Sequence, residues 1–252
     1  MFRDRPAVSQ ALLQTLADCP RRFQYRWLEQ WDERIPREQQ QRLDWGQRFH
    51  RRMQQWYLGL PVDQARGGEP ELDACFDRFR ASQPQLFVER ATARAEVRRS
   101  HYHRGWLLTG VFDLLRQTPT GLEIHDWKTG LFPRPRRQLQ HQWQTRLYLY
   151  LLAETGDLPP EQLSLTYWFV RADPVCSERF DYSAAWHGRI RRELDGLLTQ
   201  LEQGLEGAQL WAAAPHTDTL CDRCPYREPC RGGEGEATAG PVSWADVPEI
   251  SF

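Results

Sequence analysis

The spacing of apolar residues predicts helices in the first third of the chain. Ser9 is a suitable N-cap for a first helix, which the Cys19-Pro20 pair should interrupt. Residues 39–58 predict a second helix, because large apolar side chains recur there at helical spacing. A third helix is expected around residues 71–80 for the same reason.

The period of the apolar pattern then changes, and strands alternate with helices over the rest of the chain. In chain order the pattern predicts strands over 93–101, 105–116 and 122–128, a helix over 137–154, strands over 163–170 and 176–182, and a helix over 184–206. The succession of three helices, three strands, one helix, two strands and one helix predicts an α/β fold with helical additions.

The charged residues exclude two classes of protein. The chain has 252 residues with 34 acidic and 33 basic side chains, and 32 of the basic ones are arginine. Its one lysine, Lys128, follows Trp127, so the chain holds neither the Gly-Lys-Ser/Thr motif of a P-loop ATPase nor a lysine-rich nucleic-acid coat. Because the net charge is only −1, an anionic partner must meet a local basic patch.

The location of the protein follows from what its sequence lacks. No apolar run approaches the roughly 18 residues that span a bilayer, and the first residues show no apolar signal-peptide core. We therefore expect a soluble, cytoplasmic protein without a membrane partner. In that compartment the six cysteines should be free or bound to metal rather than paired in disulfides.

Two carboxylates and an ammonium converge in the hairpin predicted over residues 105–128. If the turn centres after Pro119, Asp113 lies opposite Asp126, and period two places Lys128 on the same face. Carboxylates suit Mg²⁺ or Mn²⁺, and a neighbouring lysine can orient or deprotonate an attacking water. The alternative is a solvated face with a cross-strand ion pair worth about 0.2–1 kcal/mol. Apolar neighbours favour the metal site, because unpaired buried charge is costly.

Four short motifs surround this hairpin in the sequence. They are Gly46-Gln47-Arg48-Phe49-His50, Gly110-Val111-Phe112-Asp113, Asp126-Trp127-Lys128-Thr129-Gly130 and Gln144-Thr145-Arg146-Leu147-Tyr148. In order and spacing, over roughly residues 9–231, they resemble the RecB-like branch of the PD-(D/E)xK nucleases. The resemblance is to the CRISPR-associated RecB-like exonucleases and the nuclease domain of AddB. It implies a restriction-endonuclease-like core, a mixed central sheet flanked by helices, with an N-terminal helical part and a C-terminal iron–sulfur clasp.

The resemblance also implies roles for individual residues. The metal ligands would be the side chains of His50, Asp113 and Asp126 and the carbonyl of Trp127. The catalytic residues would be Asp113, Asp126, Lys128, Glu96, Gln144 and Tyr148, with Lys128 as the catalytic lysine. Gln144 and Tyr148, at i and i+4 of a helix, would help to hold DNA near the site. Alternatively, His50 is an ordinary helix-surface histidine, and Gln144 and Tyr148 are polar positions on an amphipathic helix.

The cysteines predict a second metal site. Cys221, Cys224 and Cys230 form a compact triple, and the distant Cys19 could supply a fourth sulfur if the two ends meet. Four thiolates suit either zinc or an iron–sulfur cluster. One distant cysteine with a C-terminal triple resembles the iron–sulfur RecB-like nucleases, which implies a [4Fe-4S] cluster, with Zn²⁺ as the alternative. Cys75 and Cys176 lack partners at ligand spacing and read as small apolar residues.

Arginines indicate where nucleic acid would bind. Between Thr129 and Ala153 there are four arginines and no acid, and three of them, Arg134, Arg136 and Arg137, directly follow the Asp-x-Lys strand. Guanidinium groups pair with phosphates and stack on bases, which suits a groove for single strands. The alternative is a solvated charged face.

The sequence therefore predicts a metal-dependent DNA exonuclease with a structural iron–sulfur cluster. By resemblance it would act on single-stranded ends in DNA repair, recombination or CRISPR adaptation, beside a helicase or a CRISPR integrase. The rival prediction is a non-catalytic nucleic-acid-binding scaffold. We expect one nuclease domain over 1–232, made of N-terminal helices 9–90, a core 91–206 and a cysteine-rich clasp 216–232 joined to Cys19, followed by a flexible acidic tail 233–252.

Overall fold

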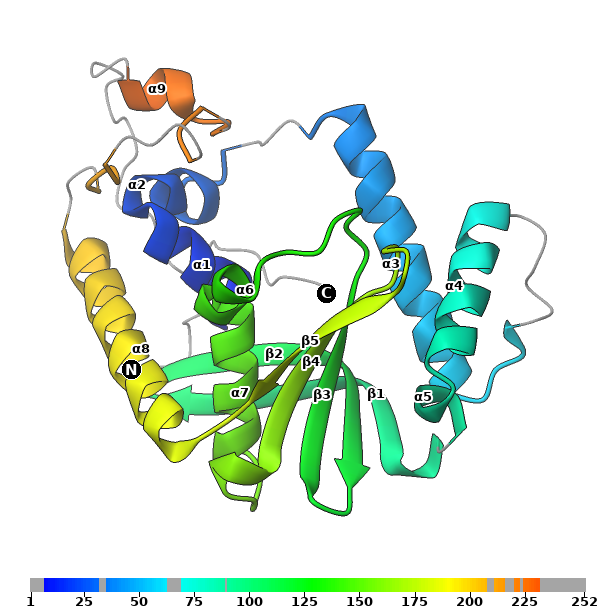
Figure 1. The fold of residues 1–252 in the computed structure, drawn as a ribbon. Helices are drawn as coiled ribbons and strands as arrows, with labels where there is room; N and C mark the ends of the chain where they lie inside the picture. Colours follow the sequence, from blue (N-terminus) through cyan, green and yellow to red (C-terminus); the bar gives the residue numbers. More distant parts are fainter. Residues whose placement is uncertain are drawn as a thin grey trace. The chain divides into compact units, whose positions relative to one another are not determined.

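A five-stranded sheet, seen in the computed structural model in Figure 1, carries the fold. The structure describes residues 7–31, 35–62, 69–88, 90–207, 211–215, 220–222 and 224–231. The strands, in sheet order, are β1 (Ala93–His103), β2 (Trp106–Thr118), β3 (Gly121–Lys128), β4 (Leu163–Phe169) and β5 (Cys176–Asp181). β2 and β3 are antiparallel, β3 and β4 parallel, and β4 and β5 antiparallel. The sheet is therefore mixed, and the α/β prediction is confirmed.

The helices agree with the apolar periodicity at most positions. They are α1 (Gln10–Asp18), α2 (Pro20–Phe23), a π-helix (Gln24–Leu28), α3 (Arg37–Tyr57), α4 (Pro70–Ser82), α5 (Gln85–Val88), short 3₁₀ turns (Arg90–Thr92 and Pro160–Gln162), α6 (Arg136–His141), α7 (Trp143–Glu154), α8 (Ala184–Glu206) and α9 (Arg227–Arg231). The backbone N–H of Leu12 donates to the Ser9 hydroxyl at 3.4 Å, as expected of an N-cap. No helix among the described residues is long and apolar enough to cross a membrane.

The single helix predicted over 137–154 is wrong, because the chain breaks at Gln142. Gln142 has extended backbone angles, φ −70° and ψ 140°, between α6 and α7. The end of α6 is satisfied locally: the Leu139 carbonyl accepts bonds from the Gln142 N–H at 3.1 Å and from the Thr145 hydroxyl at 2.6 Å. Apolar spacing runs through the break, so the pattern alone does not reveal it. The break places Gln144 in the first turn of α7.

Backbone contacts divide the chain into two compact units. The first comprises Met1–Arg34, Ser100–Thr109 and Gly188–Phe252, and the second comprises Ile35–Arg99 and Gly110–His187. The predicted acidic tail, 233–252, lies outside the described residues, as does part of the predicted clasp.

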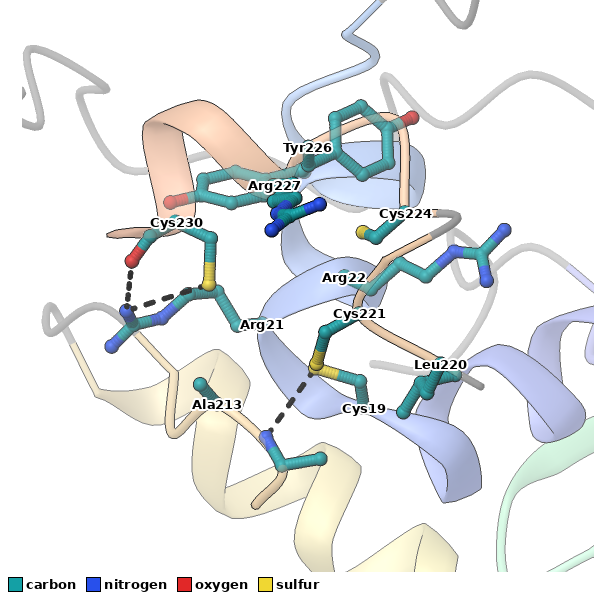
Figure 2. A pocket seen from close by; sticks show the side chains of 12 residues that line it. Cys19, Arg21, Arg22, Ala213, Leu220, Cys221, Cys224, Tyr226, Arg227 and Cys230 are labelled. Carbon is teal, nitrogen blue, oxygen red and sulfur yellow. Dashed lines mark hydrogen bonds between the residues drawn. The ribbon is translucent and has the colours of Figure 1, made fainter. Parts of the chain in front are cut away.

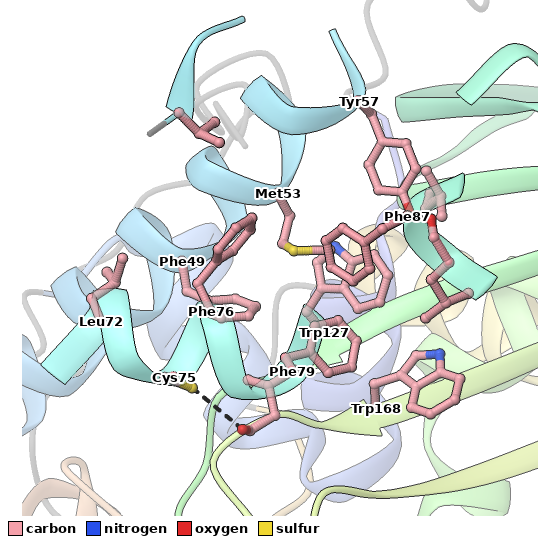
Figure 3. Packing of buried hydrophobic residues seen from close by; sticks show 14 of the residues in the cluster. Phe49, Met53, Tyr57, Leu72, Cys75, Phe76, Phe79, Phe87, Trp127 and Trp168 are labelled. Atoms are coloured by element: carbon pink, nitrogen blue, oxygen red, sulfur yellow. Dashed lines mark hydrogen bonds between the residues drawn. The ribbon is translucent and has the colours of Figure 1, made fainter. Parts of the chain in front are cut away.

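Aromatic side chains dominate the core of the second unit (Figure 3). Phe79 is fully buried, and its ring centre lies 5.5 Å from that of Trp127, 5.7 Å from Phe87 and 5.8 Å from Trp168. Edge-on contacts of this kind stabilise beyond the burial of area alone. They join helices α4 and α5 to β3 and β4. Because side chains alternate along a strand, Trp127 faces this core while its neighbours, Asp126 and Lys128, face the other side of the sheet.

In the first unit, the end of β1 and the start of β2 contact the N-terminal segment and the C-terminal part of α8. Val8 forms a parallel bridge with Leu108. The His103 Nε2 atom lies 2.7 Å from the carboxylate of Asp195, and Trp106 donates its indole N–H to Glu202 at 3.0 Å. These bonds satisfy polar groups that burial would otherwise leave unpaired.

Candidate active site

The β2–β3 hairpin places Asp113 beside Asp126. The pairs run from Leu114 opposite His125 to Thr118 opposite Gly121, which is the register predicted from the turn. One step further along this register Asp113 lies opposite Asp126. Asp113 also accepts a hydrogen bond from the Trp127 backbone N–H at 2.8 Å. The predicted convergence of these two carboxylates is therefore present in the structure.

Lys128, Asp126 and Gln144 form a closed triangle of hydrogen bonds. The Lys128 ammonium lies 2.8 Å from Asp126 Oδ2 and donates to Gln144 Oε1 at 2.6 Å, while the Gln144 amide donates to Asp126 Oδ1 at 2.7 Å. Asp126 is 2% exposed, and Lys128 lies 4.5 Å above the centre of the Tyr167 ring. Two of the three ammonium hydrogens are occupied, so the third can donate to a water or an anion.

His50 reaches the same carboxylates from α3. Its Nδ1 atom lies 3.2 Å from Asp113 Oδ1, and its Nε2 atom lies 2.9 Å from the Trp127 carbonyl. One helical turn earlier, Gly46 packs against Thr129, where an added Cβ would lie 2.8 Å from the threonine hydroxyl. The absence of a side chain at Gly46 thus allows α3 to approach the end of β3 closely.

Glu96 joins His50 and Asp113 in a potential metal site. One ligand atom each from His50, Glu96 and Asp113 lies within 4.8 Å of the others. Glu96 has φ +51° within β1, an angle that is rare for residues other than glycine and often marks functional sites. Nitrogen and carboxylate oxygens at this spacing could bind a divalent metal. Asp126 is not part of this trio, and its two oxygens contact Lys128 and Gln144.

The clustered charges shift the proton affinity of these groups. Burial lowers the pKa of His50, but the carboxylates of Asp113 and Asp126 outweigh it and raise the pKa to about 9. Burial raises the pKa of Asp126, although the Lys128 ammonium opposes this. Burial also raises the pKa of Glu96, and the charge of Asp113 adds to the effect. Glu96, Asp113 and Asp126 therefore place three carboxyl groups close together, and a bound cation would offset their negative charge.

The remaining predicted residues differ in accessibility. Tyr148 is only 4% exposed and packs against Phe112, with ring centres 5.0 Å apart, so it lines the buried side of the site. Arg134, Arg136 and Arg137 are exposed at the start of α6. Arg136 is engaged by Glu178 at 2.9 Å. The structure brings all the predicted catalytic residues to one end of β3, with the arginines next to them in the chain.

Tyr167 is a site residue that the sequence pattern does not reveal. It pairs with Asp126 across the parallel β3–β4 ladder and donates to or accepts from Thr145 at 2.8 Å, beneath the Lys128 ammonium. The strand predicted over 163–170 holds mostly apolar and aromatic residues, which gives no reason to single out one tyrosine. Only the register between β3 and β4 shows that this tyrosine lies beside Asp126.

In the first unit, the four predicted cysteines line one cavity of about 410 Å³ (Figure 2). Cys19 comes from the α1–α2 junction, and Cys221, Cys224 and Cys230 come from the C-terminal segment. Two sulfurs accept hydrogen bonds: Cys19 from the Ala214 N–H at 3.4 Å, and Cys230 from Arg21 at 4.0 Å. The structure thus places the distant Cys19 in one cavity with the triple, whereas the group that the four cysteines would bind stays a prediction.

Comparison with known proteins identifies the family. The sequence model of the PD-(D/E)XK nuclease superfamily matches residues 7–231. A search of curated proteins found no match. Among solved structures, the chain resembles a protein from Eubacterium rectale named "putative exonuclease", with a TM-score of 0.54 and 11% identity over 94% of this chain and 91% of that one. It also resembles SSO0001, with a TM-score of 0.45 and 14% identity over 90% and 86% of the two chains.

At 11% identity the likeness to the first structure concerns the fold alone. The family match carries more, because it spans both the carboxylate cluster at the end of β3 and the four cysteines. With the Asp-x-Lys sequence at the end of β3 and the mixed sheet beneath it, the chain belongs to the PD-(D/E)XK nuclease superfamily.

Proposed function

We propose that this protein is a metal-dependent deoxyribonuclease of the RecB-like type that hydrolyses DNA from single-stranded ends. The observation that carries the proposal is the cluster of His50, Glu96 and Asp113 next to the Lys128–Asp126 pair. The name of the Eubacterium rectale protein, a putative exonuclease of similar fold, agrees with action at ends. Repair, recombination or CRISPR adaptation, with a helicase or an integrase as partner, is the setting that the RecB-like resemblance implies.

The donor set fits Mg²⁺ or Mn²⁺. His50, Glu96 and Asp113 would hold the ion, with Asp126 and the Trp127 carbonyl beside them. When bound, the ion supplies an activated water and polarises the scissile phosphate. Gln144 and Asp126 fix the position of the Lys128 ammonium from two sides. Lys128 then directs its remaining hydrogen to the water or to a phosphate oxygen, where negative charge develops.

The test is cleavage of end-labelled single- and double-stranded DNA with Mg²⁺ or Mn²⁺. We expect Asp113→Ala and Lys128→Ala to lower the rate by about 10²–10⁴-fold, as for the loss of groups that act in the transition state. Lys128→Arg should fail similarly, because a bulkier, planar guanidinium does not fit where the compact ammonium lies between Gln144 and Asp126.

The matched control is Asp157→Asn, which alters an exposed carboxylate of the same unit outside the cluster. Cleavage that persists in both alanine variants would exclude the assigned site. A wild-type protein that binds DNA without cutting it would favour the non-catalytic scaffold.

We propose further that the four cysteines hold a [4Fe-4S] cluster that ties the C-terminal segment to the α1–α2 junction. Four thiols around one cavity, with N–H donors to two of the sulfurs, suit a cluster. Zinc would need sulfurs about 2.3 Å from one ion. Among the residues that the structure describes, three ligand atoms within 4.8 Å occur only at His50, Glu96 and Asp113, so the cysteines are spread more widely. This spread favours the larger group.

Visible absorption and metal analysis of anaerobically purified protein test this proposal. Cys224→Ala should abolish the iron–sulfur absorption and lower thermal stability. The matched control, Cys176→Ala, removes a thiol that does not line the cavity and should retain both. Stoichiometric zinc without iron would overturn the cluster and leave the nuclease proposal untouched.

A further inference from the structure

The connection from β3 to α6 exposes two apolar side chains directly after Lys128. Leu131 is 46% exposed and Phe132 is 82% exposed. Single exposed apolar residues are common on proteins, so exposure alone gives Phe132 no role. Its setting does. The connection, drawn in green between β3 and α6 in Figure 1, begins one residue after the lysine of the active site.

Both ends of this connection are fixed. At its start, the Lys128 carbonyl accepts a bond from the Val170 N–H at 3.2 Å. At its end, Arg136 bonds to Glu178 at 2.9 Å and to the Arg179 carbonyl at 2.6 Å, and its guanidinium lies 4.5 Å from the centre of the Phe180 ring.

Two prolines, Pro133 and Pro135, restrict the backbone between these ends. The loop is therefore anchored on both sides and presents Phe132 to solvent. An aromatic group held in this way loses little conformational entropy when a ligand covers it.

Arginines follow this aromatic side chain in the connection and in the first turn of α6. Arg134 and Arg137 are exposed and make no ion pair within the described part of the chain. From Thr129 to Ala153 the sequence holds no acid. An exposed aromatic ring next to free guanidinium groups is the combination that binds single strands, with bases stacking on the ring and phosphates meeting the arginines.

We propose that Phe132 is a base-stacking residue that holds an unpaired base of the strand entering the active site. The inference rests on the proposed nuclease function and adds how its substrate is selected. Four residues span at most about 14 Å, so the stacked base belongs to a nucleotide near the scissile bond. Inside a duplex both faces of each base are covered by its stacked neighbours, which makes Phe132 a determinant of single-strand preference.

Binding of a single-stranded oligonucleotide that carries 2-aminopurine near one end, measured by fluorescence in EDTA so that no cleavage occurs, tests the proposal. Phe132→Ala and Phe132→Leu should weaken binding by roughly 5- to 150-fold, the loss of one stacked base. Both should abolish the quenching of 2-aminopurine. Phe132→Tyr should bind and quench as the wild type does, and a blunt duplex should bind equally to all variants. Leu58→Ala, which removes an apolar side chain that is 62% exposed at the end of α3, is the matched control and should have no effect.

Cleavage assays separate this inference from the proposed function. If wild type cleaves DNA but Phe132→Ala binds and cleaves single strands normally, the stacking role is overturned and the nuclease stands. Normal binding by Phe132→Leu would also overturn it, because the contact would then be apolar rather than aromatic. If wild type does not cleave, the nuclease proposal fails, whereas loss of quenching in Phe132→Ala would still support a stacking contact.

Discussion

Replacing Gly46 by alanine should disturb the active site through a single close contact. The new Cβ would lie 2.8 Å from the Thr129 hydroxyl oxygen, whereas ordinary contacts begin at 3.4 Å, so α3, the end of β3 or the Thr129 side chain must shift by about 0.6 Å. Overpacking of this kind costs about 1–3 kcal/mol, while glycine to alanine within a helix returns about 0.5–1 kcal/mol. We expect Gly46→Ala to lower the free energy of unfolding by up to about 2.5 kcal/mol.

The assay is a double-mutant cycle with Thr129→Ala, using urea denaturation. Removing the hydroxyl leaves the Thr129 Cβ at 3.7 Å, an ordinary contact, so Gly46→Ala should become stabilising in that background. The coupling energy should equal the overpacking cost, about 1–3 kcal/mol. Gly196→Ala is the matched control, since nothing lies within 4 Å of its added Cβ, and it should stabilise by about 0.5–1 kcal/mol.

Cleavage should follow the same pattern, because α3 carries His50 one turn after Gly46. A misplacement approaching 1 Å can lower a rate by about 10²-fold, so Gly46→Ala should impair cleavage and the double variant should recover it. If Gly46→Ala is as stabilising as the Gly196 control, with coupling below about 0.5 kcal/mol, the close approach of α3 to Thr129 is refuted.

Three further predictions concern stability. Phe79→Ala should lower the free energy of unfolding by about 3–5 kcal/mol in urea titrations, because it empties the centre of the aromatic core. Gly121→Ala should destabilise strongly, with a lower melting temperature, since its Cβ would meet the backbone carbonyl of Gln162. Burial lowers the pKa of His125 from 6.5 to about 3, and its Nδ1 atom accepts the Trp168 indole N–H at 3.0 Å. Between these pH values the unfolded state binds a proton that the folded state does not, so the free energy of unfolding should fall as pH drops from 6.5 toward 3. The fall should be smaller in His125→Asn. Equal falls in the wild type and the variant would contradict this.

The sequence predicts best what depends on local pattern. The helix over 39–58 appears as Arg37–Tyr57, and the turn after Pro119 sets the register that joins Asp113 to Asp126, because loop length and period two determine which residues of a hairpin face each other. The break at Gln142 escapes prediction, since apolar spacing continues across it.

Features that depend on tertiary packing cannot be predicted from the sequence pattern either. The positive φ of Glu96 and the contact between Gly46 and Thr129 arise only when distant segments meet, and no single segment encodes them. The roles of individual site residues are implied by the family resemblance, and the structure adds the distances on which their tests depend.

The division of the chain into interleaved segments has a consequence for biosynthesis. Every segment of the second unit has been translated by His187, whereas the first unit awaits the segment that begins at Gly188. A nascent chain that stops before Cys221 would contain the carboxylate cluster and Lys128 but only one of the four cavity cysteines. Domains fold as their residues leave the ribosome, so the cysteine cavity can form only after Cys230 has been translated, later than the carboxylate cluster.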